Sequence, residues 1–139
     1  MLRRMVLLGG ILLVGVIVLS GVALADNIRG TFGEDNLPGT LQKDRIYGLG
    51  AADTISGLGG NDDCYGGSGF DVEINCGPGN DRIDGGFGED DLFGDTGNDR
   101  ILAADGRADL VDCGEGEDTA YVDEEDTVEN CEEVFVARP

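Results

Sequence analysis

The polar and apolar positions of this chain repeat with a period of nine residues. An Asp recurs at this spacing, with a one-residue slip after the fifth copy and another after the eighth: Asp35, Asp44, Asp53, Asp62, Asp71, Asp81, Asp90, Asp99, Asp109 and Asp118. Two residues after most of them stands an apolar residue: Leu37, Ile46, Ile55, Cys64, Ile83, Leu92, Ile101 and Val111. A spacing of two places both side chains on the same side of an extended backbone. Each unit therefore predicts a very short β-strand with one buried apolar residue.

Glycines fill the stretches between these strands. Five residues before the Asp stand Gly30, Gly39, Gly48, Gly57, Gly66, Cys76, Gly85 and Gly94, and two residues before it the commonest residue is again glycine. Glycine tolerates φ > 0, so these stretches predict tight turns in which carbonyl groups converge. Two turn-and-strand units make one 18-residue coil, and the thin apolar core is buried only if coils stack about 4.8 Å apart. The pattern predicts an all-β parallel solenoid of about five coils.

Stacking brings Asp residues of successive coils into register along two edges. We define the first row as Asp35, Asp53, Asp71, Asp90 and Asp109, and the second row as Asp44, Asp62, Asp81, Asp99 and Asp118. Neighbouring carboxylates repel unless a cation lies between them. Calcium accepts 6–8 carboxylate and carbonyl oxygens at ~2.3–2.6 Å, whereas magnesium requires a stricter octahedron. The rows therefore predict Ca²⁺ sites, to which we also assign the turn glycines Gly60, Gly69, Gly79, Gly88 and Gly97.

Charge and composition exclude several classes of function. The 139 residues include 29 Asp and Glu, 9 Lys and Arg, 25 Gly and no His. The formal net charge of −20 argues against nucleic acid or an anionic membrane surface as a partner. The absence of His removes Ser-His and Cys-His nucleophile pairs and His-ligated metal sites. Carboxylate chemistry remains, and hard cations are its natural partners.

The first 25 residues have the features of a secretory signal peptide. Arg3 and Arg4 precede an aliphatic run over residues 6–19, and residues 23–25 read Ala-Leu-Ala, a small-residue cleavage site. An uncleaved membrane anchor is the alternative, because residues 5–25 are 21 uncharged residues. With cleavage we expect a secreted protein of net charge −22 and no stable membrane insertion. We expect the repeats to occupy residues 26–118 and a C-terminal cap to occupy residues 119–139.

The repeat resembles the RTX, or haemolysin-type, calcium-binding nonapeptide G-G-x-G-x-D-x-U-x. The best copies are residues 66–71 (Gly-Gly-Ser-Gly-Phe-Asp) and 85–93 (Gly-Gly-Phe-Gly-Glu-Asp-Asp-Leu-Phe), and residues 57–62 and 76–83 are near matches. The resemblance extends from Gly30 to about Asp118. It implies a right-handed parallel β-roll with a row of calcium ions along each edge. The short chain with an N-terminal signal is similar to small stand-alone bacterial proteins of this family.

Some copies depart from the pattern. Gln42 and Ala51 replace the second turn glycine before Asp44 and Asp53, so we expect the Asp44 copy to bind weakly. Glu73 stands where an apolar residue belongs, with Ile74 displaced by one. The slips predict bulges or widened turns near Asn75 and Ala103. We expect the acids outside the rows to be solvated: Asp63, Asp91, Asp95, Glu115, Asp123, Glu124, Glu125 and Asp126.

The four cysteines favour disulfides, because their number is even and a signal peptide precedes them. Cys113 and Cys131 are 18 residues apart, one coil, which is a bridgeable separation, whereas Cys76 and Cys113 would lie about two coils, roughly 10 Å, apart. The prediction is Cys113–Cys131 and, from the remaining pair, Cys64–Cys76. A metal-thiolate site is the poorer alternative, since no C-x-x-C is present.

The function we expect is that of an exported, non-enzymatic calcium-binding protein whose folding depends on the ion. The highly charged chain has little core to offset its conformational entropy, so ion binding would supply folding free energy. An extracellular adhesion or matrix module with a cell-envelope or polysaccharide partner is one alternative. A β-helix polysaccharide-degrading enzyme is another, although the repeat already accounts for nearly every acid such an enzyme would use. The oligomeric state is not indicated by the sequence.

Overall fold

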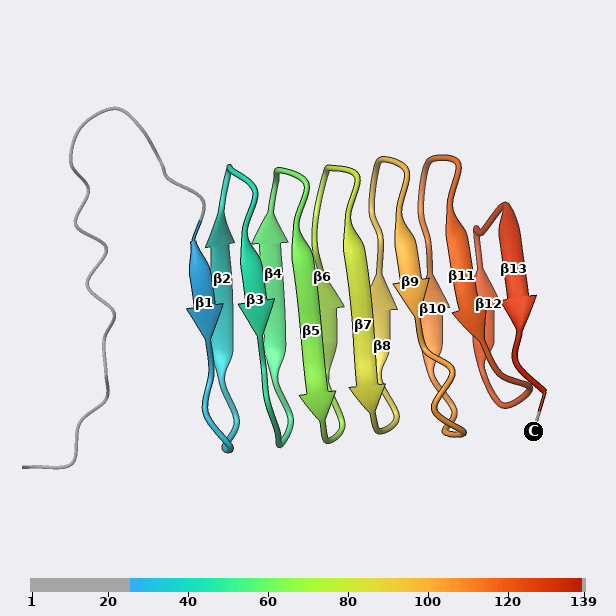
Figure 1. Cartoon of the computed structure of the whole chain (residues 1–139), viewed down its shortest axis with the longest axis horizontal. Helices are drawn as coiled ribbons and strands as arrows, with labels where there is room; N and C mark the ends of the chain where they lie inside the picture. Colours follow the sequence, from blue (N-terminus) through green and yellow to red (C-terminus); the bar gives the residue numbers. More distant parts are fainter. Residues whose placement is uncertain (1–25, 139) are drawn as a thin grey trace, which may run out of the picture.

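The computed structural model describes residues 26–138, which form thirteen short β-strands and no helix (Figure 1). The part of the chain described here accordingly provides no apolar helix of membrane-spanning length. The predicted signal peptide, residues 1–25, lies outside the described residues. One sheet contains the odd-numbered strands: β1 (Asn27–Arg29), β3 (Arg45–Tyr47), β5 (Asp63–Ser68), β7 (Arg82–Phe87), β9 (Arg100–Leu102), β11 (Thr119–Val122) and β13 (Glu133–Val136). The other contains the even-numbered strands: β2 (Asn36–Thr40), β4 (Thr54–Leu58), β6 (Glu73–Asn75), β8 (Asp91–Phe93), β10 (Leu110–Asp112) and β12 (Thr127–Glu129).

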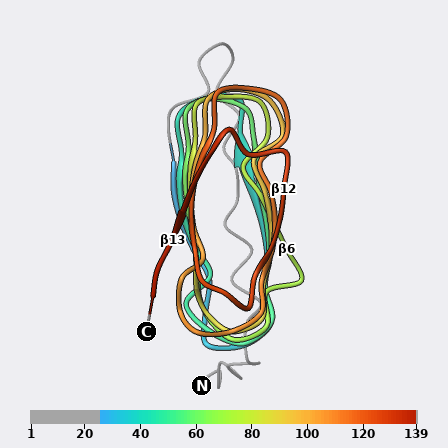
Figure 2. The same ribbon diagram turned by 90° about the vertical axis from the view of Figure 1, so that its right-hand side faces the viewer.

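The strands form a parallel β-solenoid, as the period predicts. Each strand pairs in parallel with the strand two places along the chain, so Ile46 lies beside Cys64 and Cys64 lies beside Ile83. Seen along the solenoid axis, the coils superimpose as a flattened oval with one sheet on each long side (Figure 2). The turns that lead into the even strands carry the first row at the lower edge of Figure 1, and the other turns carry the second row at the upper edge.

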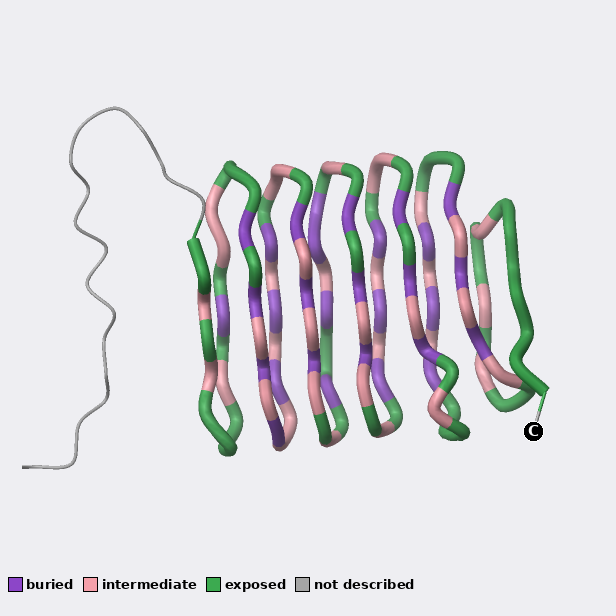
Figure 3. The backbone as a smooth tube through the Cα atoms, in the orientation of Figure 1, coloured by how far each residue is buried: buried purple, intermediate pink, exposed green. Residues whose placement is uncertain are grey.

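The core is a file of apolar side chains between the two sheets. Burial alternates along the strands (Figure 3), because successive side chains point inward and outward. The residue two positions after the row Asp is fully buried in most coils: Ile46, Ile55, Cys64, Ile83, Leu92, Ile101, Val111 and Ala120. The row Asp residues from Asp44 to Asp118 are themselves buried at the edges of this core. The prediction that Asp and the apolar residue share one face is confirmed.

The two one-residue slips have different structures. The first lies at Val72 rather than near Asn75: the amide of Val72 donates to the Asp53 carbonyl, while Glu73 already pairs with Thr54. This bulge exposes Val72 and keeps Ile74 fully buried, and the ribbon bows outward at β6 (Figure 2). The second slip widens the turn at 103–108, between β9 and β10, as predicted.

The solenoid has more coils than the five predicted from the Asp spacing, with about six turns. At the N-terminal end, Asp26 precedes β1 and its amide donates to Asp44 (2.7 Å). At the other end, β11, β12 and β13 continue both sheets through the segment expected to form a cap, residues 119–139. The last coil is shorter, and its strands follow Asp126 and Glu132, whose spacing breaks the nine-residue period. For this reason the sequence pattern fades before the solenoid ends.

Both predicted disulfides are present. Cys64 pairs with Cys76, with Cα atoms 6.4 Å apart, and Cys113 pairs with Cys131, with Cα atoms 5.1 Å apart. The first connects the core position of β5 to the turn that leads into β7, and the second connects one coil to the last turn of the solenoid. The thiolate-metal alternative is therefore wrong, because no free cysteine remains among the described residues.

Candidate metal centre

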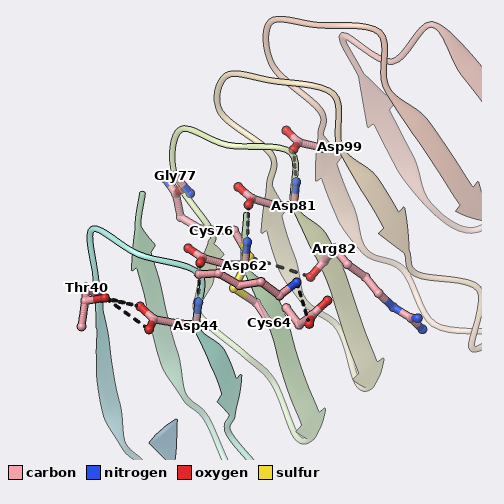
Figure 4. Close-up of a disulfide and its surroundings, with 12 residues drawn as sticks. Thr40, Asp44, Asp62, Cys64, Cys76, Gly77, Asp81, Arg82 and Asp99 are labelled. Atoms are coloured by element: carbon pink, nitrogen blue, oxygen red, sulfur yellow. Dashed lines mark hydrogen bonds and ion pairs between the residues drawn. A yellow bond between two sulfur atoms is a disulfide. The ribbon is translucent and has the colours of Figure 1, made fainter. Parts of the chain in front are cut away.

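Each row of carboxylates forms a chain of hydrogen bonds along one edge of the solenoid. The amide N–H of each row Asp from Asp35 to Asp99 donates to Oδ1 of the row Asp in the next coil, at 2.7–2.9 Å. Figure 4 shows Asp44, Asp62, Asp81 and Asp99 of the second row aligned in this way. The structure thus brings together all ten predicted acids in the two rows that the period implies. The side chain of every row Asp except Asp35 accepts a hydrogen bond from the backbone of the preceding coil.

The second carboxylate oxygen of most row residues is buried without a hydrogen-bond partner. This holds for Oδ2 of Asp53, Asp62, Asp71, Asp81, Asp90, Asp99 and Asp118. A buried polar atom without a partner carries the cost of its desolvation, and that cost is larger for a charged group. Seven such atoms in one small fold indicate that the turns hold a ligand that binds carboxylate oxygen, which is either a cation or a hydrogen-bond donor.

A main-chain carbonyl faces the same space as the free oxygen. A Cβ atom added to Gly48 would collide with Oδ2 of Asp53 and with the carbonyl oxygen of Gly66 in the next coil. At Gly30 the corresponding oxygens lie 2.8 Å (Asp35 Oδ2) and 2.7 Å (Gly48 carbonyl) from such an atom. The same convergence of carboxylate and carbonyl occurs at Gly39, Gly57, Gly66 and Gly94. The first turn glycine is thus required where these oxygens meet.

Burial makes the inner row carboxyls weaker acids than a solvent-exposed Asp. It raises the pKa of Asp71 and Asp99 to about 6 and of Asp81, Asp90 and Asp109 to about 7. The donated backbone N–H lowers each pKa, but by less than burial raises it, and neighbouring row carboxylates raise it further. A bound cation would remove this penalty by pairing the ionised form.

Comparison with known families gives the same repeat. The family described as the RTX calcium-binding nonapeptide repeat matches residues 38–73 and 77–101 in this chain. These stretches are RTX calcium-binding repeats. No curated protein and no solved structure shows a significant match to it.

The RTX repeats imply calcium as the bound ion, and the residues present fit it. Carboxylate and carbonyl oxygens in loose geometry are the ligands that calcium prefers. Within residues 26–138, no three Cys, Asp or Glu side chains are arranged so that they could hold a metal ion by themselves. The oxygens instead come from one carboxylate and the backbone of adjacent coils. When bound, calcium would supply the positively charged partner that the buried Oδ2 atoms lack.

The turns differ in whether Oδ2 of the row Asp already accepts hydrogen bonds from its own turn. Oδ2 of Asp35 accepts from the amide (2.5 Å) and hydroxyl (2.9 Å) of Thr31, and Oδ2 of Asp44 accepts from those of Thr40 (2.6 and 2.9 Å). In the turn of Asp90 no carbonyl oxygen lies within 3.4 Å of a Cβ atom added to Gly85, because the widened turn 103–108 is the next turn on that edge. The turns of Asp53, Asp62, Asp71 and Asp99 combine a free Oδ2 with a facing carbonyl.

The turn glycines predicted as ligands have a visible structural role. A Cβ atom on any of these five glycines would collide with the backbone of the preceding coil, so they permit close stacking: Gly60, Gly69, Gly79, Gly88 and Gly97. The collision would be most severe at Gly88, with φ 151°, against the carbonyl of Gly69, and at Gly97, with φ 133°, against that of Gly79. Ala51 adopts φ 73° in place of a glycine, so its turn is kept. As calcium ligands these five glycines stay a prediction.

Sequence reasoning missed several residues of the rows. Asp126, expected to be solvated, accepts the Asp109 amide in the first row (2.9 Å). In the second row Glu132 accepts the Asp118 amide (2.9 Å), and its longer side chain takes the place of an Asp. Asp26 stands nine residues before Asp35, so the period itself could have identified it. The facing carbonyl belongs to the residue at the first-turn-glycine position of the next coil. The repeat spacing could therefore have identified it.

Proposed function

We propose that this protein is an exported, non-enzymatic calcium-binding module that folds when it binds calcium. The observation that carries this proposal is the set of buried Asp Oδ2 atoms that have no partner and, in four turns, face a main-chain carbonyl. The ligands proposed are Oδ2 of the row Asp residues and the carbonyl oxygens of the adjacent coil. We expect the strongest sites at Asp53, Asp62, Asp71 and Asp99.

The coupling of folding to calcium follows from the charge. Folding without an ion buries two rows of carboxylates at a spacing of one coil, in a chain of net charge −20. Either the carboxyls take up protons or their charge stays unpaired, and both oppose folding at neutral pH. An ion that binds only the folded state shifts the equilibrium by mass action. Calcium binding energy thus becomes folding energy.

Export is supported by two independent features. The N-terminal segment has the basic, apolar and small-residue parts of a signal peptide. The two disulfides belong to the oxidising compartments outside the cytosol. A non-enzymatic role is supported by the use of the row carboxylates as acceptors for backbone N–H groups, which makes them poor candidates for acid-base chemistry.

The test is far-UV circular dichroism of residues 26–139, with disulfides intact, titrated with calcium after treatment with a chelator. We expect a cooperative transition to β-structure with calcium and a much weaker response to the same concentrations of magnesium. A spectrum that is already β-rich and does not change with calcium would contradict the proposal.

A matched pair of variants localises the effect. Asp71→Asn keeps Oδ1 as the acceptor for the Asp53 amide but removes the charge and the free Oδ2 of a buried site. Asp91→Asn makes the same chemical change on β8, where the side chain is half-buried and points out of the solenoid. We expect the calcium concentration at the transition midpoint to rise at least several-fold in Asp71→Asn and to stay unchanged in Asp91→Asn.

A further inference from the structure

Each disulfide has one cysteine at a position that is occupied by glycine in most other turns. Cys76 stands five residues before Asp81 and Cys113 five residues before Asp118, where seven of the other eight copies have the first turn glycine. Both cysteines are fully buried. Each cross-link therefore has one end in a turn of the second row.

The carbonyl groups of these two cysteines line two of the strongest candidate sites. A Cβ atom added to Gly57 would collide with the carbonyl oxygen of Cys76 and with Oδ2 of Asp62. One added to Gly94 would collide with the carbonyl oxygen of Cys113 and would lie 2.7 Å from Oδ2 of Asp99. Both Oδ2 atoms are buried without a partner. Each disulfide thus starts at the residue whose carbonyl faces a free carboxylate oxygen.

The covalent bonds hold these carbonyls without help from an ion. Cys64, the partner of Cys76, is fixed in the core of β5, beside Ile46 and Ile83. Cys131, the partner of Cys113, ties the last turn to the coil before it. At the Asp53 and Asp71 sites of the first row, the equivalent carbonyl belongs to Gly66 or Gly85. Glycine loses more conformational freedom on folding than any other residue, whereas a cross-linked residue has lost part of it already.

We propose that the two disulfides are positioning groups for calcium. They preorganise the Cys76 and Cys113 carbonyls against Asp62 and Asp99, so that these two sites bind calcium more tightly in the oxidised protein. By linkage, calcium makes the same disulfides harder to reduce. This inference rests on the proposed calcium-binding function and adds a redox dependence to two of its sites.

The redox step is a two-electron exchange with a dithiol. The dithiol gives two electrons and two protons to the Cys64–Cys76 bond, which becomes two thiols, while the dithiol closes its own disulfide. Cys64 and Cys76 are both inaccessible to solvent, whereas Cys131 is partly exposed. We therefore expect Cys113–Cys131 to react first in the folded protein.

A double-mutant cycle on the calcium affinity of the full chain, freed of calcium before the titration, separates local positioning from general stabilisation. One arm combines the double variant Cys64→Ala/Cys76→Ala with Asp62→Asn, and the matched arm combines it with Asp71→Asn, in the other row. Calcium affinity is measured by isothermal titration calorimetry. Loss of the disulfide should lower the affinity about tenfold when Asp62 is present and much less when it is not. With Asp71→Asn the two effects should be additive.

The outcomes are distinct. Additive effects in both arms would overturn the positioning role while leaving calcium binding intact. An intact oxidised protein that binds no calcium would overturn the proposed function, and this inference with it. If the cysteine variant does not fold, the deciding measurement is the midpoint potential of each disulfide, with and without calcium, in protein that keeps all four cysteines. A calcium-induced shift of Cys64–Cys76 that is lost in Asp62→Asn but kept in Asp71→Asn supports the inference, and equal loss in both refutes it.

Discussion

Lowering the pH from about 7.5 to about 5 without calcium is expected to stabilise the folded protein, opposite to the behaviour of most salt-bridged carboxylates. In the folded state the pKa is about 6 for Asp71 and Asp99 and about 7 for Asp81, Asp90 and Asp109, against an ordinary value of 3.8. Raised values mean that the stabilisation is complete below the unfolded pKa and is lost as the pH rises through 6 to 7. Folding should take up roughly four to five protons at about pH 5 and almost none at about pH 8.

The assay is urea unfolding followed by circular dichroism in chelator between about pH 5 and pH 8, repeated with saturating calcium. Without calcium the urea midpoint should fall steeply towards zero as the pH rises, whereas with calcium the dependence should weaken, because calcium replaces the protons. A series at about 1 M salt serves as the control, since screening removes repulsion between exposed charges but affects buried groups much less. A calcium-free protein that is less stable at pH 5 than at pH 7.5 would refute the reasoning.

Three further predictions concern single residues of the solenoid. Ile83→Ala removes a fully buried side chain from the single apolar file, so chemical unfolding with calcium present should show a loss of about 2–5 kcal/mol, and a loss below about 1 kcal/mol would contradict the packing described. Gly88→Ala should be far more destabilising in thermal unfolding than Gly106→Ala, because both glycines have φ > 0 but a Cβ atom meets the Gly69 carbonyl only at Gly88. Calorimetry should show a smaller loss of calcium affinity for Asp90→Asn than for Asp71→Asn, since only the Asp71 turn has a facing carbonyl, and equal losses would argue against carbonyl ligation.

The regular part of this fold could be predicted because the same residue types recur at the same spacing in every coil. The Asp and the apolar residue two positions later share one face of each strand, and stacking at a fixed spacing forces both into rows. The disulfide Cys113–Cys131 followed from the same rule, since one coil separates the two cysteines. The strict period was therefore enough to predict the sheet topology, the two rows and the pairing of Cys113 with Cys131.

Irregular positions were harder to predict because local sequence does not fix register. The bulge at Val72 lies three residues from the predicted position, since the backbone can absorb an extra residue anywhere between Asp71 and Ile74. Asp126 and Glu132 join the rows only because the last coil shortens and a longer side chain spans the difference. Neither residue follows the nine-residue period, so no sequence spacing marks them.

The sequence by itself determined the solenoid, its two rows of acids and calcium as the fitting ion, because these depend on a period and on ligand chemistry. Only the tertiary structure decided which turns leave a carboxylate oxygen free. Thr31 and Thr40 satisfy two carboxylates within their own turns, the widened turn removes a carbonyl from Asp90, and Cys76 brings one to Asp62. These differences arise between coils that are 18 or 19 residues apart in the chain and become neighbours only when the coils stack.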